Sequence, residues 1–171
     1  MAKRTTGGNT MSKTEYVIEP GSYEIVMTHV FDAPRELVFK AYTDPKLFAQ
    51  WWGPREYTNR IDKFDARPGG EWRVVQIDAD GNEHAFRGVH HEVVVPERTV
   101  ATFEFEGVPG HVLLQTATFE PLGDKTKVVQ QAVFQSVADR DGMVASGMKR
   151  GSDDSMDRLA ELLEKMKTGR A

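Results

Sequence analysis

The fold class that the sequence predicts is α+β, with seven antiparallel strands, two short helices after the first strand and a long C-terminal helix. Two observations lead to this prediction. Between residues 56 and 136, strand patterns alternate with turns, and no helix intervenes to make a parallel crossover. After residue 142, the spacing of apolar residues changes to three and four, as in an amphipathic helix.

Length and composition fit one globular domain and exclude several classes of site. The chain has 171 residues, of which 39% are hydrophobic. It has no cysteine, which excludes disulfides, thiolate metal sites and cysteine nucleophiles. The net charge of −4 argues against a nucleic-acid partner, and no apolar run has the length of a membrane span. We therefore expect a single domain over residues 21–168, with no nucleic acid bound and no membrane insertion.

Residues 1–20 are expected to form a disordered N-terminal tail, because this stretch is polar and rich in small residues. It carries Lys3, Arg4 and Lys13 but no apolar segment of the kind found in a secretory signal. The cytoplasm is therefore the expected location.

The first strand and two short helices are expected between residues 22 and 54. Alternate residues of 22–31 are apolar or aromatic, as in a half-buried strand. Asp32 is the expected N-cap of the first helix, and Asp44 caps the second, with Pro45 in its first turn. The second helix carries two i,i+4 pairs of large apolar residues, Leu47 with Trp51 and Phe48 with Trp52. Only one of the two adjacent tryptophans can point fully inward.

Six further strands are expected, each separated from the next by a turn sequence. The first of them precedes the turn Arg67-Pro68-Gly69-Gly70. The other five are expected at residues 71–77, 84–94, 99–105, 112–119 and 126–135. The stretch Asp78-Ala79-Asp80-Gly81-Asn82 is a strong hairpin signal. Strands joined by such short turns pair antiparallel with their neighbours.

The C-terminal helix is expected to be roughly 25 residues long and amphipathic. Its apolar face comprises Val144, Met148, Gly151, Ser155, Leu159, Leu162 and Met166. Gly142, Gly147 and Gly151 weaken the first half, since each costs about 1 kcal/mol relative to alanine. The small residues there either pack closely against the sheet or leave room for another molecule.

Several motifs, in their order and spacing, resemble one family. The motifs are Phe31-Asp32-Ala33-Pro34-Arg35-Glu36-Leu37-Val38-Phe39, Asp44-Pro45-Lys46-Leu47-Phe48-Ala49-Gln50-Trp51-Trp52-Gly53-Pro54, Arg67-Pro68-Gly69-Gly70-Glu71-Trp72-Arg73, Asp80-Gly81-Asn82-Glu83, and Gly88 with Pro96-Glu97-Arg98. Together they resemble the START-like, or SRPBCC, superfamily. Within it they resemble the branch of homologues of the activator of the heat-shock-protein-90 ATPase. The resemblance covers residues 22–167.

The resemblance implies a helix-grip fold, in which a curved sheet wraps around the C-terminal helix and a cavity often lies between them. Members of the superfamily bind lipids, sterols, polyketides or hormones, and some are aromatase/cyclases. Members of this branch often form homodimers. The activator that gives the branch its name has an additional N-terminal domain, so the resemblance does not by itself imply a co-chaperone role.

Strand parity predicts which side chains face such a cavity. Phe103 and Phe105 share one face of their strand, opposite Thr102 and Glu104. Parity on the other strands adds Trp72, Phe86, His90, Gln130 and Phe134, and positions on the helices add Trp52, Met143 and Met148. The predicted ligand-binding residues are therefore Trp52, Trp72, Phe86, His90, Phe103, Phe105, Gln130, Phe134, Met143 and Met148. A mostly apolar cavity with few polar groups is typical of small-molecule sites. The alternative is a dry core that these side chains fill.

Catalytic and metal sites find little support in the sequence. The five histidines form no helical His-Glu-x-x-His motif, and no Gly-x-Ser-x-Gly sequence or phosphate-binding loop is present. We therefore expect no metal, no cofactor and no assigned catalytic residue. His29 and His90 are the two histidines expected to face inward, and either could act as a general acid or base.

The function expected is non-enzymatic binding of a small hydrophobic or aromatic molecule between the sheet and the C-terminal helix. Two alternatives stay open. One is an enzyme of cyclase or hydrolase type that uses His90 or another polar residue of the same pocket. The other is a protein-interaction module of chaperone-activator type, which no basic or large apolar surface patch in the sequence favours. The resemblance makes a homodimer one possible assembly, and the sequence does not decide the oligomeric state.

Overall fold

A computed structural model describes residues 13–170 of the chain. Within them, eight strands form one sheet: β1 (Glu15–Val17), β2 (Glu24–Phe31), β3 (Thr58–Phe64), β4 (Glu71–Ile77), β5 (Glu83–Val94), β6 (Arg98–Phe105), β7 (Val112–Leu122) and β8 (Lys125–Val133). Four helices accompany the sheet: α1 (Arg35–Thr43), α2 (Pro45–Trp51), α3 (Val137–Ala145) and α4 (Met148–Lys167).

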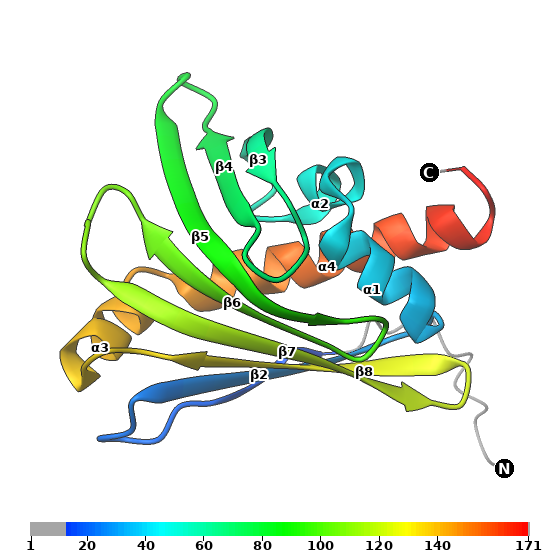
Figure 1. Cartoon of the computed structure of the whole chain (residues 1–171), viewed down its shortest axis with the longest axis horizontal. Coiled ribbons are helices and arrows are strands. Elements are labelled where there is room, and N and C mark those ends of the chain that lie inside the picture. The colour runs from blue at the N-terminus through cyan, green and yellow to red at the C-terminus, as the bar shows by residue number, and fades with distance from the viewer. Residues whose placement is uncertain (1–12, 171) are drawn as a thin grey trace, which may run out of the picture.

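The strands are ordered β1-β2-β8-β7-β6-β5-β4-β3, and every neighbouring pair is antiparallel. The sheet curves, and α4 runs along its concave side, with α1 and α2 beside it (Figure 1). The predicted α+β fold, with a sheet wrapped around the C-terminal helix, is therefore confirmed. The described residues contain eight strands rather than the seven predicted.

The additional strand is β1, which lies within the predicted disordered tail. It pairs with β2, and Tyr16 stands opposite Met27. The Tyr16 hydroxyl donates a hydrogen bond to Asp153 Oδ1 of α4 over 2.8 Å, and the Thr14 hydroxyl is 2.9 Å from His29 Nδ1. The expectation of a disordered tail is thus wrong for Glu15–Val17, because partners distant in sequence hold this strand. Residues 1–12 of the predicted tail lie outside the described residues.

The predicted long C-terminal helix is α4, which has 20 residues rather than roughly 25. The residues before it form a separate helix, α3, and the two are separated at Gly147, whose φ of 85° is left-handed. That conformation ends the regular helix and is readily adopted only by glycine. Ser136 caps α3 by accepting a hydrogen bond from Asp139 N.

Of the two predicted helix caps, Asp44 is confirmed and Asp32 is not. Asp44 caps α2, because its carboxylate accepts hydrogen bonds from the backbone N–H groups of Lys46 and Leu47. Asp32 does not cap α1; the residue at that position is Pro34, without a side-chain hydrogen bond. Proline fixes the backbone before the helix without supplying an acceptor.

The main core lies between the sheet and α1, α2 and the C-terminal half of α4. Its most deeply buried members include Phe31, Val38, Trp51, Phe119, Val128, Leu159 and Leu163. Burial of each such side chain contributes about 1.5–3 kcal/mol. The N-terminal half of α4 instead carries Gly151, Ser152 and Ser155 toward the sheet. These small residues leave the space beneath them open.

The strand at the other edge of the sheet, β3, is irregular and charged. Its pairing with β4 shifts in register between Ile61 and Lys63. Arg60 forms ion pairs with Asp62 and with Glu83, at 3.0 and 2.7 Å. Only β4 pairs with this strand among the described residues.

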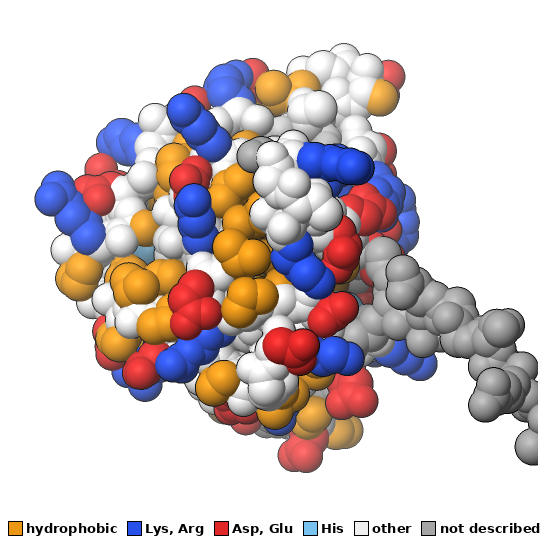
Figure 2. Space-filling model, turned by 90° about the vertical axis from the view of Figure 1, so that its right-hand side faces the viewer, with side chains coloured by type: hydrophobic (Ala, Val, Ile, Leu, Met, Phe, Trp, Pro, Cys, Tyr) orange, Lys and Arg blue, Asp and Glu red, His pale blue; other side chains and the backbone are white. Residues whose placement is uncertain are grey.

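The molecular surface mixes charges of both signs. Figure 2 shows basic and acidic side chains interspersed over one face, with apolar side chains between them. One of the exposed ion pairs joins Arg55 to Glu161 of α4 at 2.5 Å. Of the helices in the described part of the chain, none combines the length and apolar character that a bilayer crossing requires.

Candidate functional site

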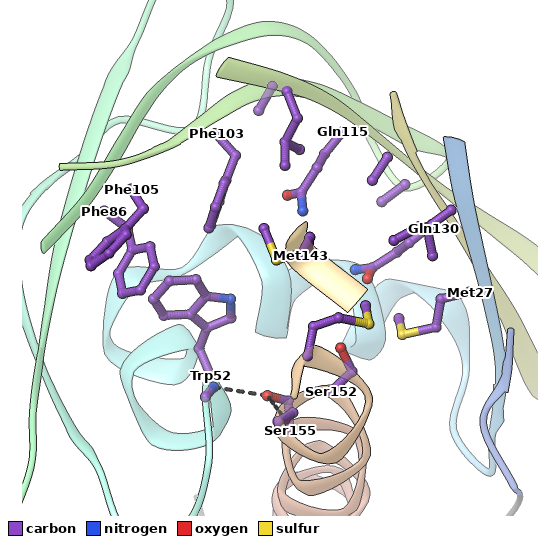
Figure 3. A pocket seen from close by; sticks show the side chains of 18 of the residues that line it. Met27, Trp52, Phe86, Phe103, Phe105, Gln115, Gln130, Met143, Ser152 and Ser155 are labelled. Carbon is purple, nitrogen blue, oxygen red and sulfur yellow. Dashed lines mark hydrogen bonds between the residues drawn. The ribbon is translucent and has the colours of Figure 1, made fainter. Parts of the chain in front are cut away.

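A cavity of about 470 Å³ lies between the concave face of the sheet and the N-terminal half of α4 (Figure 3). Small-molecule sites are usually about 300–1,000 Å³ in volume. All ten residues predicted to bind a ligand line this cavity: Trp52, Trp72, Phe86, His90, Phe103, Phe105, Gln130, Phe134, Met143 and Met148. The predicted inner-face parity therefore holds at these positions. Their role in ligand binding stays a prediction.

Five aromatic side chains form one end of the cavity, which we call the aromatic end: Trp52, Trp72, Phe86, Phe103 and Phe105. The ring of Phe86 lies 5.1 Å from that of Trp52, 5.4 Å from Phe103 and 5.1 Å from Phe105, between centroids. The Trp52 and Phe86 rings are perpendicular. Such spacings favour edge-to-face and offset contacts, which add about 0.5–1.5 kcal/mol per pair to area burial.

Gly88 makes room for the aromatic end on the floor of the sheet. A β-carbon there would lie 1.9 Å from Thr102 O and 2.5 Å from Trp72 Nε1. Those two atoms are joined by a hydrogen bond, which Trp72 Nε1 donates to Thr102 O over 3.1 Å. The absence of a side chain at residue 88 thus lets the Trp72 indole cross the neighbouring strand.

The turn that follows α2 positions Trp52. The Arg158 guanidinium of α4 donates hydrogen bonds to four carbonyl oxygens of this segment, those of Gln50, Trp52, Gly53 and Pro54. Ser155 Oγ accepts a hydrogen bond from Gly53 N over 2.8 Å (Figure 3). Burial lowers the pKa of Arg158 from its ordinary value. The helix therefore holds the turn through both a side-chain hydroxyl and a cation.

The other end of the cavity is polar, and we call it the amide end: Tyr42, Gln115 and Gln130. Figure 3 shows Gln115 and Gln130 pointing into the cavity, Gln115 beside Phe103 and Gln130 on the side away from the aromatic end. Gln130 Nε2 donates a hydrogen bond to the Tyr42 hydroxyl over 3.0 Å. Burial raises the pKa of the Tyr42 phenol, so this group is neutral at physiological pH.

Small residues leave the Gln115 amide uncovered. Ala101 on β6 and Ala132 on β8 stand opposite Gln115 on its two sides. Among the described residues that line the cavity, none is Asp, Glu, Lys or Arg. The polar groups available to a ligand are consequently uncharged amides, hydroxyls and imidazoles.

Comparison with protein families identifies the family to which the chain belongs. The model of the family described as Activator of Hsp90 ATPase homolog 1-like protein matches residues 32–164. The chain belongs to this family. The predicted branch is thereby confirmed. Among curated proteins, none matches the sequence significantly.

Solved structures support the fold of this family member. A protein from Arthrobacter aurescens is 20% identical, with a TM-score of 0.82, over 88% of this chain and 91% of that one. A protein from Mycobacterium smegmatis is 20% identical, with a TM-score of 0.80, over 89% and 96%. A protein from Chromobacterium violaceum is 28% identical, with a TM-score of 0.71, over 81% and 96%. These similarities show the fold alone.

Three of the five histidines, His29, His84 and His90, lie in different settings. His90 lines the cavity, is 7% exposed, and its Nδ1 atom has no hydrogen-bond partner in the described part of the chain. Burial lowers its pKa, so the ring is neutral at physiological pH. His29 is buried as predicted, but it lies in the core and outside the cavity lining. His84 does line the cavity, 3.5 Å from Asp78 Oδ2, so the expectation that only His29 and His90 face inward is wrong.

Sequence reasoning missed several cavity residues. Gln115 alternates with the buried Leu113 and Ala117 on β7, so the strand parity used for Phe103 could have found it. Tyr42, at the end of α1, carries no such periodic signal. Within residues 13–170, no three His, Asp or Glu side chains are close enough together to hold a metal ion.

Proposed function

We propose that this protein binds a small hydrophobic or aromatic molecule in the cavity between the sheet and α4, without transforming it. The observation that carries the proposal is a cavity of about 470 Å³ with an aromatic end, a few polar groups and no charged side chain among its described lining residues. Apolar burial would supply the affinity, and one or two hydrogen bonds would set the ligand's orientation.

The hydrogen bonds around the cavity support binding more than catalysis. Among the described residues, no hydrogen bond joins His84 or His90 to a serine, threonine or tyrosine hydroxyl that could serve as a nucleophile. An activated nucleophile needs such a base within hydrogen-bond reach. An enzyme in the same pocket and a chaperone-activator role are hypotheses without an observation of their own. The cytoplasmic location and the homodimer stay predictions.

Thermal unfolding of the full chain, in the presence of lipids, polyketides, flavonoids and other aromatic metabolites, tests the proposal. A ligand at 100 times its Kd should add about 2.7 kcal/mol of stability. Each kcal/mol raises Tm by roughly 2–4 °C for a domain of this size. We expect one chemical class to raise Tm reproducibly.

A plugged cavity provides the control. Ala101→Phe fills the cavity floor beside Gln115 and should abolish the ligand-induced rise in Tm. Thr118→Leu adds volume on the opposite face of β7, which does not line the cavity, and should leave the rise intact. A rise that survives Ala101→Phe, or no rise with any compound, would contradict the proposal.

A further inference from the structure

We infer that the ligand is a neutral aromatic ring system that carries an uncharged carbonyl, hydroxyl or carboxamide group directly on the rings. The rings lie at the aromatic end, and the polar group lies at the amide end. This inference rests on the proposed function, because it specifies the ligand of the same cavity.

The cavity offers a charged ligand no counter-ion. No described lining residue is acidic or basic, and the titratable side chains that face the cavity are Tyr42, Tyr57, His84 and His90. An unpaired carboxylate or ammonium group is costly to remove from water. His90, Ala101 and Gln115 lie side by side on β5, β6 and β7. His84 is six residues from His90 along β5, which corresponds to about 20 Å. His84 therefore cannot reach a group at the amide end.

The amide end can satisfy both a donor and an acceptor. Ala132 is opposite Gln115 and Ala117 is opposite Gln130, so the two glutamines are diagonal neighbours on β7 and β8. Diagonal neighbours lie about 7–8 Å apart, within reach of one shared polar group. Each side-chain amide has donor and acceptor atoms, and Gln130 Nε2 is already bonded to Tyr42. A ligand carbonyl, hydroxyl or carboxamide matches these atoms.

The sheet register sets the distance from Phe103 to Gln115, the nearer of the two amides. Phe103 stands opposite Leu113, and Ala101 stands opposite Gln115. Phe103 and Gln115 are therefore also diagonal neighbours, about 7–8 Å apart. This distance suits a polar group attached directly to the rings and does not require a long chain between them. Ala101, two residues from Phe103 on β6 and opposite Gln115, leaves the floor open for the ring system.

Three matched naphthalenes test the inference on the full chain labelled with nitrogen-15: 2-naphthamide, 2-naphthoate and 2-methylnaphthalene. They share one ring system and differ in a neutral polar, a charged or an apolar substituent. NMR titrations at pH 7.5 would give the Kd of each. The side-chain NH₂ resonances of Gln115 and Gln130 would report where the substituent lies.

We expect 2-naphthamide to bind at least tenfold more tightly than either of the other two, a difference of about 1.4 kcal/mol. It should shift the NH₂ resonances of both glutamines. Gln115→Leu should remove the advantage over 2-methylnaphthalene, and Thr118→Leu on the opposite face should preserve it. Gln115→Arg should reverse the order of the amide and the carboxylate by placing a cation at the amide end.

Each contrary result has a distinct meaning. Equal affinities of 2-naphthamide and 2-naphthoate would overturn the inference and leave the proposed function standing. The same holds if none of the three binds while the metabolite screen yields other ligands. If neither the naphthalenes nor the screen yields a ligand, the proposed function falls as well. If Gln115→Leu weakens 2-methylnaphthalene as much as 2-naphthamide, the placement of the polar group is wrong; the Tm of the free variant shows whether it is folded.

Discussion

The hydroxyl of Ser155 accepts a hydrogen bond from the backbone N–H of Gly53 over 2.8 Å. The same hydroxyl donates to Gly151 O, one turn earlier in α4, over 2.9 Å. Gly53 follows Trp52 in the chain, so this pair of bonds locates the aromatic end of the cavity relative to the helix. The side chain is buried, and water cannot readily replace it.

Ser155→Ala should lower the free energy of unfolding by about 1–3 kcal/mol, because the Gly53 N–H loses its buried acceptor. Urea denaturation would measure the change. Ser152→Ala is the matched control: this serine lies on the same helix and lines the same cavity. Equal losses in the two variants would contradict the role assigned to the Gly53 bond.

Arg158→Ala should cost about 1.5–3 kcal/mol, because several carbonyl oxygens lose a charged donor together. Arg55→Ala removes an arginine from the same region, but its ion pair with Glu161 is half exposed. Such a pair contributes only about 0–1 kcal/mol. Chemical denaturation of both variants compares them directly, and a cost of Arg55→Ala as large as that of Arg158→Ala would refute this account.

Gly88→Ala should destabilise the fold by roughly 1–3 kcal/mol, since the added carbon collides with Thr102 O and Trp72 Nε1. The near-ultraviolet circular dichroism of the tryptophans should change with it. Gly142→Ala provides the control, because it lies in α3 with no other atom within 4 Å of its added carbon. That variant should gain up to about 1 kcal/mol. An unchanged free energy of unfolding in Gly88→Ala would show that the sheet rearranges to accommodate the added carbon.

Acidification should destabilise the protein through two buried histidines. Burial lowers the pKa of both His29 and His90. Below the unfolded-state value of about 6.5, the unfolded chain takes up protons at these positions that the folded protein does not. The free energy of unfolding therefore falls as the pH drops through 6.5, until the lowered folded-state pKa values are reached. Above that range neither histidine contributes.

Thermal unfolding between pH 7.5 and 5.5 would measure this slope. His29→Asn and His90→Asn should each flatten it, because each removes one proton uptake that accompanies unfolding. His91→Asn, at an exposed position next to His90, is the control. An unchanged slope in both buried-histidine variants would assign the pH dependence to other groups.

The inner face of the sheet was predictable because its period is short and regular. Phe103 and Phe105 alternate with polar residues, and the same two-residue period places Phe86 and His90. The pattern held on every strand used for the prediction. The cap of α2 was predictable for a similar reason, since Asp44 and Pro45 act on adjacent backbone groups.

Features that depend on distant contacts were not predictable. The three residues of β1 carry no periodic signal, and Tyr16 is held by a bond to Asp153. The helical spacing also continues across Gly147, so the pattern of apolar residues could not indicate the left-handed backbone that separates α3 from α4. In both cases the tertiary structure overrides the local pattern.

The irregular, charged β3 has a consequence for how copies of the chain meet. Exposed sheet edges are templates for aggregation, and kinks and charges on an edge strand oppose this. The β3 edge has both features: the register shift at Ile61 interrupts its regular pairing, and the ion-paired Arg60 supplies charge. The opposite edge is β1, which is only three residues long. Continuous strand pairing between two molecules is thus disfavoured at either edge of the described sheet.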